Sequence, residues 1–296
     1  MSKVPIRFSS EGSTGEYRPE PSEIEVPRLD GAGIDGIEPA EDLGRSEHLK
    51  AVRAGEVGSI HSWELVTAVD GPGTRMTTFF SGCPLRCVYC HNPDTLQMRD
   101  GTAVTAEALL KKIKRYRAVF RTSGGGVTFS GGEPLFQPAF LAHLLRECKK
   151  LGIHTAIDTS GFLGAALTDE MMENLDLVLL DVKSGISETY KRTTDRELEP
   201  TLRFGKRLSD AGKPIWVRFV LVPGWTDAPE NVEAVADIVA KWKSVERVEV
   251  LPFHQMARDK WDNLGLEYQL EAVEPPSKEA TEQVREVFRA RGLLTF

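Results

Sequence analysis

Short apolar runs alternate, from about residue 59 to the C-terminus, with segments in which apolar positions recur every three or four residues. The first pattern predicts buried strands and the second predicts amphipathic helices. The predicted strands are residues 76–80, 127–129, 153–157, 175–182, 215–222 and 247–252. The predicted helices are residues 106–119, 136–150, 169–174, 198–211, 230–243 and 278–291. This alternation is typical of βα units around a parallel sheet, either a partial barrel or an open doubly wound sheet, with the chemistry at the carboxyl ends of the strands.

The first 55 residues differ from the rest of the chain. They contain five Pro, seven Gly, eleven acidic and seven basic residues, with Phe8 and Tyr17 as the only aromatic residues. Such a segment has little apolar surface to bury. We therefore predict a largely disordered acidic extension over residues 1–55 and one domain over residues 56–296.

The composition is that of a globular protein, with 41% apolar and 27% charged residues. The 37 basic and 44 acidic residues give a net charge of -7, which argues against a nucleic-acid partner bound through its phosphates. No apolar run approaches the 18 or so residues of a membrane span, and no secretory signal is visible at the N-terminus. These features predict a cytoplasmic protein without a membrane partner.

Three of the four cysteines follow the first predicted strand in a C-x3-C-x2-C arrangement, at Cys83, Cys87 and Cys90. Three thiolates at this spacing can hold three irons of a 4Fe-4S cluster and leave the fourth iron open to a ligand. Cys148 lies in a predicted helix and is interpreted as a buried structural thiol. A zinc site with His91 or Cys148 as fourth ligand stays open as an alternative.

Further motifs accompany the cysteines. The run SGGGVTFSGGEP covers residues 123–134, VDGPGTR covers residues 69–75 and LPFH covers residues 251–254. With these motifs the chain resembles the radical S-adenosylmethionine enzymes and, among them, the glycyl-radical enzyme activases of the pyruvate formate-lyase type. The resemblance extends over about residues 59–296. Other activases carry a ferredoxin-like module, for which this chain lacks the additional cysteines.

The resemblance implies a partial (β/α)6 barrel of the TIM type that holds one 4Fe-4S cluster on the three cysteines. It also implies that reductive cleavage of S-adenosylmethionine yields a 5′-deoxyadenosyl radical, which removes hydrogen from a backbone glycine of pyruvate formate-lyase. A flavodoxin or a ferredoxin-type protein would supply the electron. The alternatives are an activase of another glycyl-radical enzyme, including anaerobic ribonucleotide reductase, a radical enzyme acting on a small molecule, and a non-catalytic Fe-S or zinc protein.

The resemblance also assigns candidate site residues. S-adenosylmethionine is expected to contact Tyr89, His91, Gly131, Gly132, Glu133, Asp158, Asp181, Lys183 and His254. In that set Glu133 balances the ammonium group and Lys183 reaches the carboxylate. A monovalent cation is assigned to Asp158, Thr159 and Asp181, and contact with the protein substrate is assigned to Asp70. The simpler interpretations are turn or helix caps for the aspartates and plain packing for Tyr89 and His91.

Overall fold

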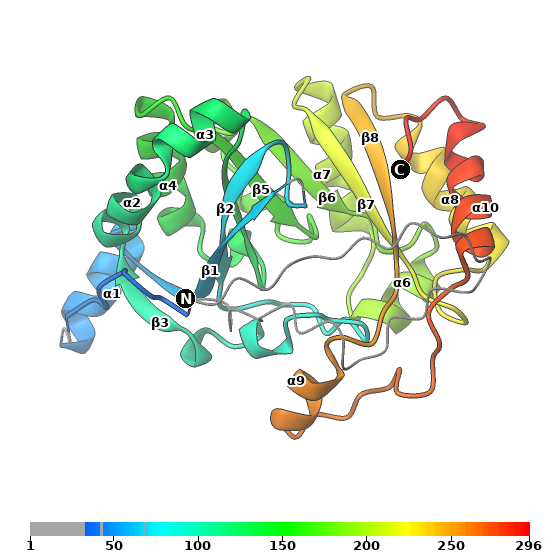
Figure 1. Cartoon of the computed structure of the whole chain (residues 1–296), viewed down its shortest axis with the longest axis horizontal. Helices are drawn as coiled ribbons and strands as arrows, with labels where there is room; N and C mark the ends of the chain where they lie inside the picture. Colours follow the sequence, from blue (N-terminus) through cyan, green and yellow to red (C-terminus); the bar gives the residue numbers. More distant parts are fainter. Residues whose placement is uncertain (1–32, 42–43, 68) are drawn as a thin grey trace, which may run out of the picture. The chain divides into compact units, whose positions relative to one another are not determined.

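The computed structural model describes residues 33–41, 44–67 and 69–296. Its centre is an eight-stranded sheet with the strand order β3-β1-β2-β4-β5-β6-β7-β8 (Figure 1). The strands are β1 Val57–Thr67, β2 Thr74–Phe80, β3 Thr102–Thr105, β4 Gly126–Gly131, β5 His154–Thr159, β6 Leu177–Asp181, β7 Ile215–Leu221 and β8 Val245–Pro252. From β2 to β8 all neighbouring strands are parallel, whereas β1 runs antiparallel to β2 and β3.

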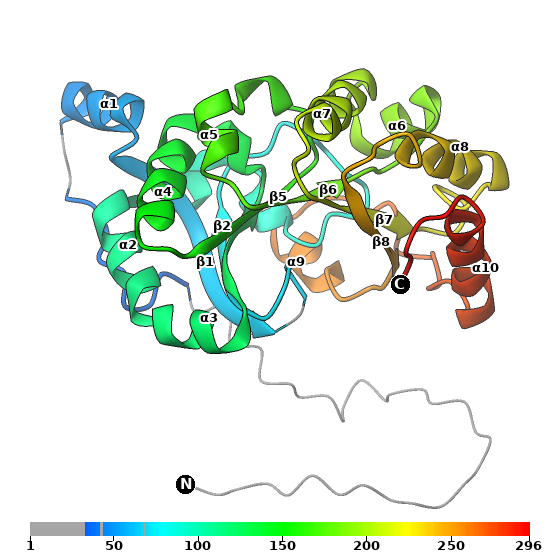
Figure 2. The same ribbon diagram turned by 90° about the horizontal axis from the view of Figure 1, so that it is seen from above.

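Helices connect the parallel strands. The α-helices are α1 Arg45–Ala54, α2 Ala106–Arg115, α3 Arg117–Ser123, α4 Pro138–Lys150, α5 Asp169–Glu173, α6 Ser187–Thr194, α7 Glu199–Asp210, α8 Pro229–Val239, α9 Arg258–Asn263 and α10 Lys278–Arg289. The short 3-10 helices are η1 Pro93–Thr95, η2 Met98–Asp100, η3 Pro134–Phe136 and η4 Gly164–Ala166. In Figure 2 the helices α4, α5, α7, α6 and α8 lie along one face of the sheet, and α9 lies on the other.

The predicted partial (β/α)6 barrel is confirmed. The six predicted strands correspond to β2, β4, β5, β6, β7 and β8, which are the six parallel strands. The inner strands are nearly continuously buried, as in β4 and β6, because helices cover a parallel sheet, whereas β8 at the end of the sheet is mostly half-buried or exposed. The sheet is not closed, since β3 and β8 form its two ends. The structure adds β1 and β3, which were not predicted, and it divides the predicted helix 106–119 into α2 and α3 at Tyr116.

The domain boundary predicted after residue 55 is too late. Ile37 is only 4% exposed and belongs to the main core. The Asp35 carbonyl accepts hydrogen bonds from Trp63 Nε1 at 3.0 Å and from Lys112 Nζ at 2.9 Å, and Ala40 N donates to the Ala103 carbonyl at 2.8 Å. Residues 33–41 and 44–55 are therefore part of the domain. The disorder predicted for residues 1–32 and 42–43 lies outside the described residues.

Deleting residues 1–55 is accordingly expected to destabilise the domain, in contrast to the expectation from composition. Loss of the buried Ile37 side chain and of three hydrogen bonds corresponds to about 3–5 kcal/mol, or a fall in Tm of about 10 °C. Deletion of residues 1–31 keeps all these contacts and is the matched control in differential scanning calorimetry. Equal Tm values for the two deletions would contradict the packing role of residues 33–55.

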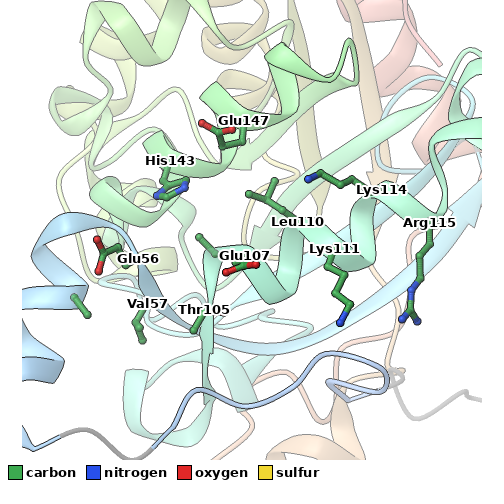
Figure 3. A pocket seen from close by; sticks show the side chains of 12 residues that line it. Glu56, Val57, Thr105, Glu107, Leu110, Lys111, Lys114, Arg115, His143 and Glu147 are labelled. Carbon is green, nitrogen blue, oxygen red and sulfur yellow. The ribbon is translucent and has the colours of Figure 1, made fainter.

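A large cavity lies between α1, α2, α4 and the start of β1. It measures about 910 Å³ and is lined by residues of α1, α2 and α4, among them Lys111, Lys114, His143 and Glu147 (Figure 3). It contains no cysteine and none of the candidate site residues. We therefore locate the active site elsewhere.

No helix in the described ranges combines the length and the apolar character needed to cross a bilayer.

Candidate active site

A second cavity, of about 600 Å³, lies at the carboxyl ends of the parallel strands. It brings together nearly all the candidate residues: Asp70, Cys83, Cys87, Tyr89, Cys90, His91, Gly131, Gly132, Asp158, Thr159, Asp181, Lys183 and His254. Parallel strands end at one edge of the sheet, so residues far apart in the sequence meet there. The exception is Glu133, which does not line the cavity.

The cysteine loop, residues 81–92, follows β2 and is fixed by backbone hydrogen bonds. Gly82 N donates to the Thr95 carbonyl at 2.7 Å, and Cys83 N donates to the Leu96 carbonyl at 3.1 Å. Trp261 Nε1 donates to the Cys90 carbonyl at 2.9 Å. These bonds hold the loop at the edge of the cavity and leave the three thiols inside it.

The loop is packed against a small apolar cluster separate from the main core. This cysteine-loop cluster consists of Val88, Tyr89, Val222, Phe253, Ala257, Trp261, Tyr268 and Leu270. Cys90 and Trp225 are partly buried against it. The loop therefore has its own apolar support.

All four cysteines are free. Burial raises the pKa of Cys83, Cys87 and Cys90, for Cys90 to about 12, so metal binding at these thiols must release protons. Cys148 is buried in α4 within the main core, where burial raises its pKa to about 12. It does not line the cavity, which agrees with a structural role.

Two glycines form the edge of the cavity at the end of β4. Gly131 has φ +104°, and a Cβ on it would lie 2.4 Å from Phe80 N. A Cβ on Gly132 would lie 2.4 Å from the Gly82 carbonyl oxygen. Any larger side chain would push β4 away from β2 and the cysteine loop. The glycines thus bring the turn against the loop and present a backbone edge to the cavity.

Glu133 follows β4 as predicted, but its side chain does not line the cavity. Its side chain is buried, and Oε1 accepts from Thr159 Oγ1 at 2.6 Å and Leu135 N at 3.2 Å. Oε2 accepts from Ser160 Oγ at 2.6 Å and Ser160 N at 3.0 Å. With four donors already in place, the carboxylate joins the end of β4 to the end of β5. The predicted contact between Glu133 and a cofactor ammonium stays a prediction, since the carboxylate does not line the cavity.

Asp181 and Lys183 form a close pair at the end of β6. Lys183 Nζ lies 2.7 Å from Asp181 Oδ2 and 5.5 Å from the centre of the Tyr89 ring. Burial by itself lowers the pKa of Lys183, but the Asp181 carboxylate, together with Tyr89 and Cys87, outweighs this effect, and the pKa lies well above the ordinary value. Lys183 is therefore a permanent cation inside the cavity.

Asp158 is a half-buried acid at the end of β5, with 18% of its side chain exposed. Its Oδ2 accepts from Ser130 Oγ at 2.8 Å and lies 3.2 Å from Arg218 Nη1. Its Oδ1 is buried and has no partner among the described residues. Burial raises the pKa of Asp158 to about 7, even though Arg218 acts in the opposite direction. This carboxylate has an open position for a bound cation or donor.

Arg218 is a site residue that the sequence analysis missed. Its side chain, 9% exposed, extends from β7 into the cavity. It lies 3.2 Å from each of the carboxylates of Asp70, Asp158 and Glu249, and it donates to the Val69 carbonyl at 2.6 Å. Burial opposes its charge, but Asp158 and Asp70 raise its pKa. In the sequence, the only indication that Arg218 belongs to the site was its position as a single arginine within the apolar strand IWVRFVL.

Asp70 lies closer to the candidate cofactor residues than its sequence position suggested. Its Oδ2 accepts from Thr77 Oγ1 at 3.0 Å, and its backbone carbonyl accepts from Thr128 Oγ1 at 2.6 Å. Through Arg218 it is linked to Asp158. Its side chain is 14% exposed. Asp70 is thus held at the wall of the cavity and not on the outer surface.

His91 and His254 form a ring pair on another wall, with centroids 4.1 Å apart and planes inclined by 39°. Burial, together with His254, lowers the pKa of His91 to about 4. Burial also lowers the pKa of His254. Both rings are therefore neutral near pH 7 and form a weakly polar aromatic wall.

The cavity fits a metal cluster together with a polar organic cofactor. Three free thiols, one permanent ammonium group and two glycine backbones face the same space. Tyr89 Oη and Asp158 Oδ1 are buried polar atoms without partners in the described part of the chain, as expected where a ligand completes a site. Within that part, no group of three or more His, Cys, Asp or Glu side chains is arranged to hold a single metal ion.

Comparisons with known proteins agree with this geometry. The radical SAM superfamily matches residues 77–237. The pyruvate formate-lyase-activating enzyme of Clostridium pasteurianum is 45% identical over 233 residues, covering 79% of this chain and 98% of that protein. The pyruvate formate-lyase 1-activating enzyme of Escherichia coli (strain K12) is 42% identical over 238 residues, covering 80% of this chain and 97% of that protein.

Solved structures resemble the fold. A domain of pyruvate-formate lyase-activating enzyme from Bacteroides vulgatus has a TM-score of 0.50 at 31% identity, covering 58% of this chain and 98% of that one. A radical SAM methyltransferase from Sphaerobacter thermophilus has a TM-score of 0.57 at 16% identity, covering 88% of this chain and 76% of that one. At that identity the second similarity concerns the fold alone.

Proposed function

The chain belongs to the radical SAM superfamily and, within it, to the pyruvate formate-lyase-activating enzymes, and from this premise we infer that it installs the glycyl radical of pyruvate formate-lyase. The observation that carries the inference is the convergence of three free thiols on the cavity that holds the Asp181–Lys183 pair. When bound, the 4Fe-4S cluster and S-adenosylmethionine supply a 5′-deoxyadenosyl radical that takes hydrogen from a backbone glycine.

The residues of the chain bind, orient and shield these groups. Cys83, Cys87 and Cys90 hold three irons. Lys183 is the cation for the methionyl carboxylate, since its charge is permanent and it lies beside the thiols. The backbone of Gly131 and Gly132 accommodates the methionyl end. Tyr89, His91 and His254 enclose the adenosine portion with neutral rings and exclude water.

Glu133 acts indirectly, as a positioning residue. By accepting four hydrogen bonds it fixes Thr159 and Ser160, both of which line the cavity. We place a monovalent cation at the unpartnered Oδ1 of Asp158, with Asp181 nearby on the same cavity. The four free cysteines suit a reducing compartment, and we assign the reaction to the cytoplasm.

The function is tested by anaerobic mixing of the reconstituted protein with pyruvate formate-lyase, S-adenosylmethionine and a chemical reductant. We expect a glycyl radical signal by electron paramagnetic resonance and one 5′-deoxyadenosine per radical. Cleavage of the cofactor without a glycyl signal on this partner would point to another glycyl-radical enzyme or to a small-molecule substrate.

We propose that Asp70 contacts the glycine-bearing loop of the partner. The carboxylate lies at the cavity wall, held by Thr77 and Arg218, and precedes the Gly71-Pro72-Gly73 bend. Asp70→Ala is expected to cleave S-adenosylmethionine slowly in the absence of partner, as the parent does, but to install the glycyl radical at least about tenfold more slowly, because a misplaced reactant loses rate steeply.

Thr77→Val is the matched control, since it removes one hydrogen bond to Asp70 and keeps the carboxylate. It should show a smaller loss. If uncoupled cleavage and radical installation fall equally in Asp70→Ala, Asp70 serves the fold or the cofactor, and the assignment to the partner fails.

A further inference from the structure

A basic surface lies on the outer side of the cysteine loop. It consists of one residue of the loop and three at or just after the C-terminal end of α6: Arg86, Lys191, Arg192 and Arg196. Backbone hydrogen bonds join the two segments, from Arg86 N to the Thr194 carbonyl at 2.9 Å and from Val88 N to the Thr193 carbonyl at 3.0 Å. Four positive charges are thus attached directly to the segment that carries the three thiols.

Two of these charges are partly neutralised. Lys191 Nζ lies 3.5 Å from carboxylate oxygens of Asp195 and Glu197, and Arg196 Nη1 lies 3.1 Å from Asp195. Four basic groups less two acidic ones leave a local charge of +2, in a chain whose net charge is -7. The basic surface is therefore of opposite sign to the protein as a whole.

The other two charges form no ion pair with any carboxylate in the described ranges. Arg86 Nη1 donates to the Cys83 carbonyl at 2.9 Å, and Arg86 is exposed. Arg192 lies 4.9 Å from the centre of the Trp225 ring and donates to the Trp225 carbonyl at 3.0 Å. Both guanidinium groups are thus oriented by the protein and keep their charge available to a partner.

Packed side chains connect the basic surface to the cysteine loop. Trp225 packs against the cysteine-loop cluster, as does Cys90. None of the four basic residues lines the catalytic cavity, whereas Val69 and Leu251, both exposed, do. A protein bound at the basic surface would leave the cavity free for the glycine-bearing partner. Arg86 also lines the neighbouring groove toward α9, which carries Asp100 and Glu267, and it therefore marks the border of the basic surface on that side.

We propose that this basic surface docks the electron donor, an acidic redox protein with a flavin or iron-sulfur group near its own surface. The proposal rests on the proposed function, because the reductive cleavage consumes one electron that the side chains of this chain do not supply. The donor is oxidised by one electron and the site at the cysteine loop is reduced by one. That electron is consumed when the carbon-sulfur bond of S-adenosylmethionine breaks.

Charge decides how salt affects this encounter. Two proteins of net negative charge repel each other at long range, so added salt should speed their association if no local contact intervenes. An oppositely charged contact reverses the sign, because screening over a Debye length of about 10 Å at 0.1 M weakens the attraction at the interface. We expect binding and reduction to weaken as ionic strength rises.

The experiment uses the full chain and a flavodoxin of net negative charge as the probe. Lys191→Glu/Arg192→Glu is compared with Lys111→Glu/Lys114→Glu, which makes the same charge change on exposed residues of α2 (Figure 3). We expect the flavodoxin affinity, measured by titration at low ionic strength, to fall about tenfold or more in the α6 variant and less than about twofold in the α2 variant. The rate of oxidation of reduced flavodoxin should follow the same order.

A small-molecule reductant bypasses the redox protein and so separates an effect on donor docking from an effect on catalysis. With it, both variants should keep their iron and sulfide content and install the glycyl radical like the parent. Equal flavodoxin affinity in the two variants would overturn the proposal, as would faster association of the unaltered protein with rising salt, a measurement that needs no variant. Loss of radical installation with the chemical reductant in the α6 variant alone would instead identify a surface for the glycine-bearing partner. Failure of the parent with every reductant would contradict the proposed function itself.

Discussion

The variant Cys87→Ser is expected to lose the metal cluster and, with it, cleavage of S-adenosylmethionine. Only three thiols line the cavity, so the loss of one leaves two anchors for four irons. Cys87 is buried in the cavity wall, and a serine hydroxyl there is a poor ligand for iron. We expect iron and sulfide to fall to near background and cleavage to fall at least about hundredfold.

Cys148→Ser is the matched control. It makes the same chemical change in α4, outside the cavity, and should keep full iron, sulfide and cleavage, with some loss of stability because a hydroxyl replaces a buried thiol. The measurements are iron and sulfide analysis and the electron paramagnetic resonance of the reduced cluster after anaerobic reconstitution. A cluster retained in Cys87→Ser would overturn the assignment of the three ligands.

The variant Arg218→Met is expected to be strongly destabilised, and increasingly so at alkaline pH. It leaves the carboxylates of Asp70, Asp158 and Glu249 facing one another without their common cation. Breaking a buried ion pair in this way costs about 3–5 kcal/mol, or about 10 °C in Tm. Binding of S-adenosylmethionine should also weaken about tenfold, since Asp158 loses its orientation.

The pH dependence follows from Asp158. Its pKa in the folded chain is about 7, above the ordinary 3.8, so the folded state holds more protons and stability falls as the pH rises through this window. Without Arg218 the folded pKa rises further. Scanning calorimetry should therefore show a deficit relative to the parent that is smaller at pH 6 than at pH 8.5.

Arg218→Lys, which keeps the charge, should recover part of the stability, and Glu249→Gln, which removes only one carboxylate of the three, should cost little. A deficit of the same size at both pH values would show that Arg218 acts through packing and not through charge.

The sequence predicted most of the site because its residues stand at positions that the fold brings together automatically. Asp158 and Asp181 follow buried strands, and the parallel arrangement places them at one edge. The three cysteines are close in sequence, so their convergence needs only one loop. In such cases the motif and the direction of the strand are enough to predict that the residues meet in one site.

Other features depend on contacts that no local pattern contains. Arg218 meets Asp70 across 148 residues, and an arginine in a strand does not reveal which carboxylates it faces. Glu133 has the predicted position, but the turn after β4 directs its side chain toward β5 and away from the cavity. β1 lacks a continuous apolar run and β3 has only four residues, so neither matched the pattern of a buried parallel strand; both join the sheet as an antiparallel edge.

The separate cysteine-loop cluster has a consequence for how the protein acquires its metal. The loop is supported chiefly by the cysteine-loop cluster and a few hydrogen bonds, while the main core lies between the sheet and its helices. Such a satellite unit can open at a fraction of the free energy of global unfolding. Iron and sulfide can then enter, and oxygen can destroy the assembled cluster, through a local fluctuation that leaves the barrel folded. After air destroys the cluster, the polypeptide stays folded, and a new cluster can be assembled on it.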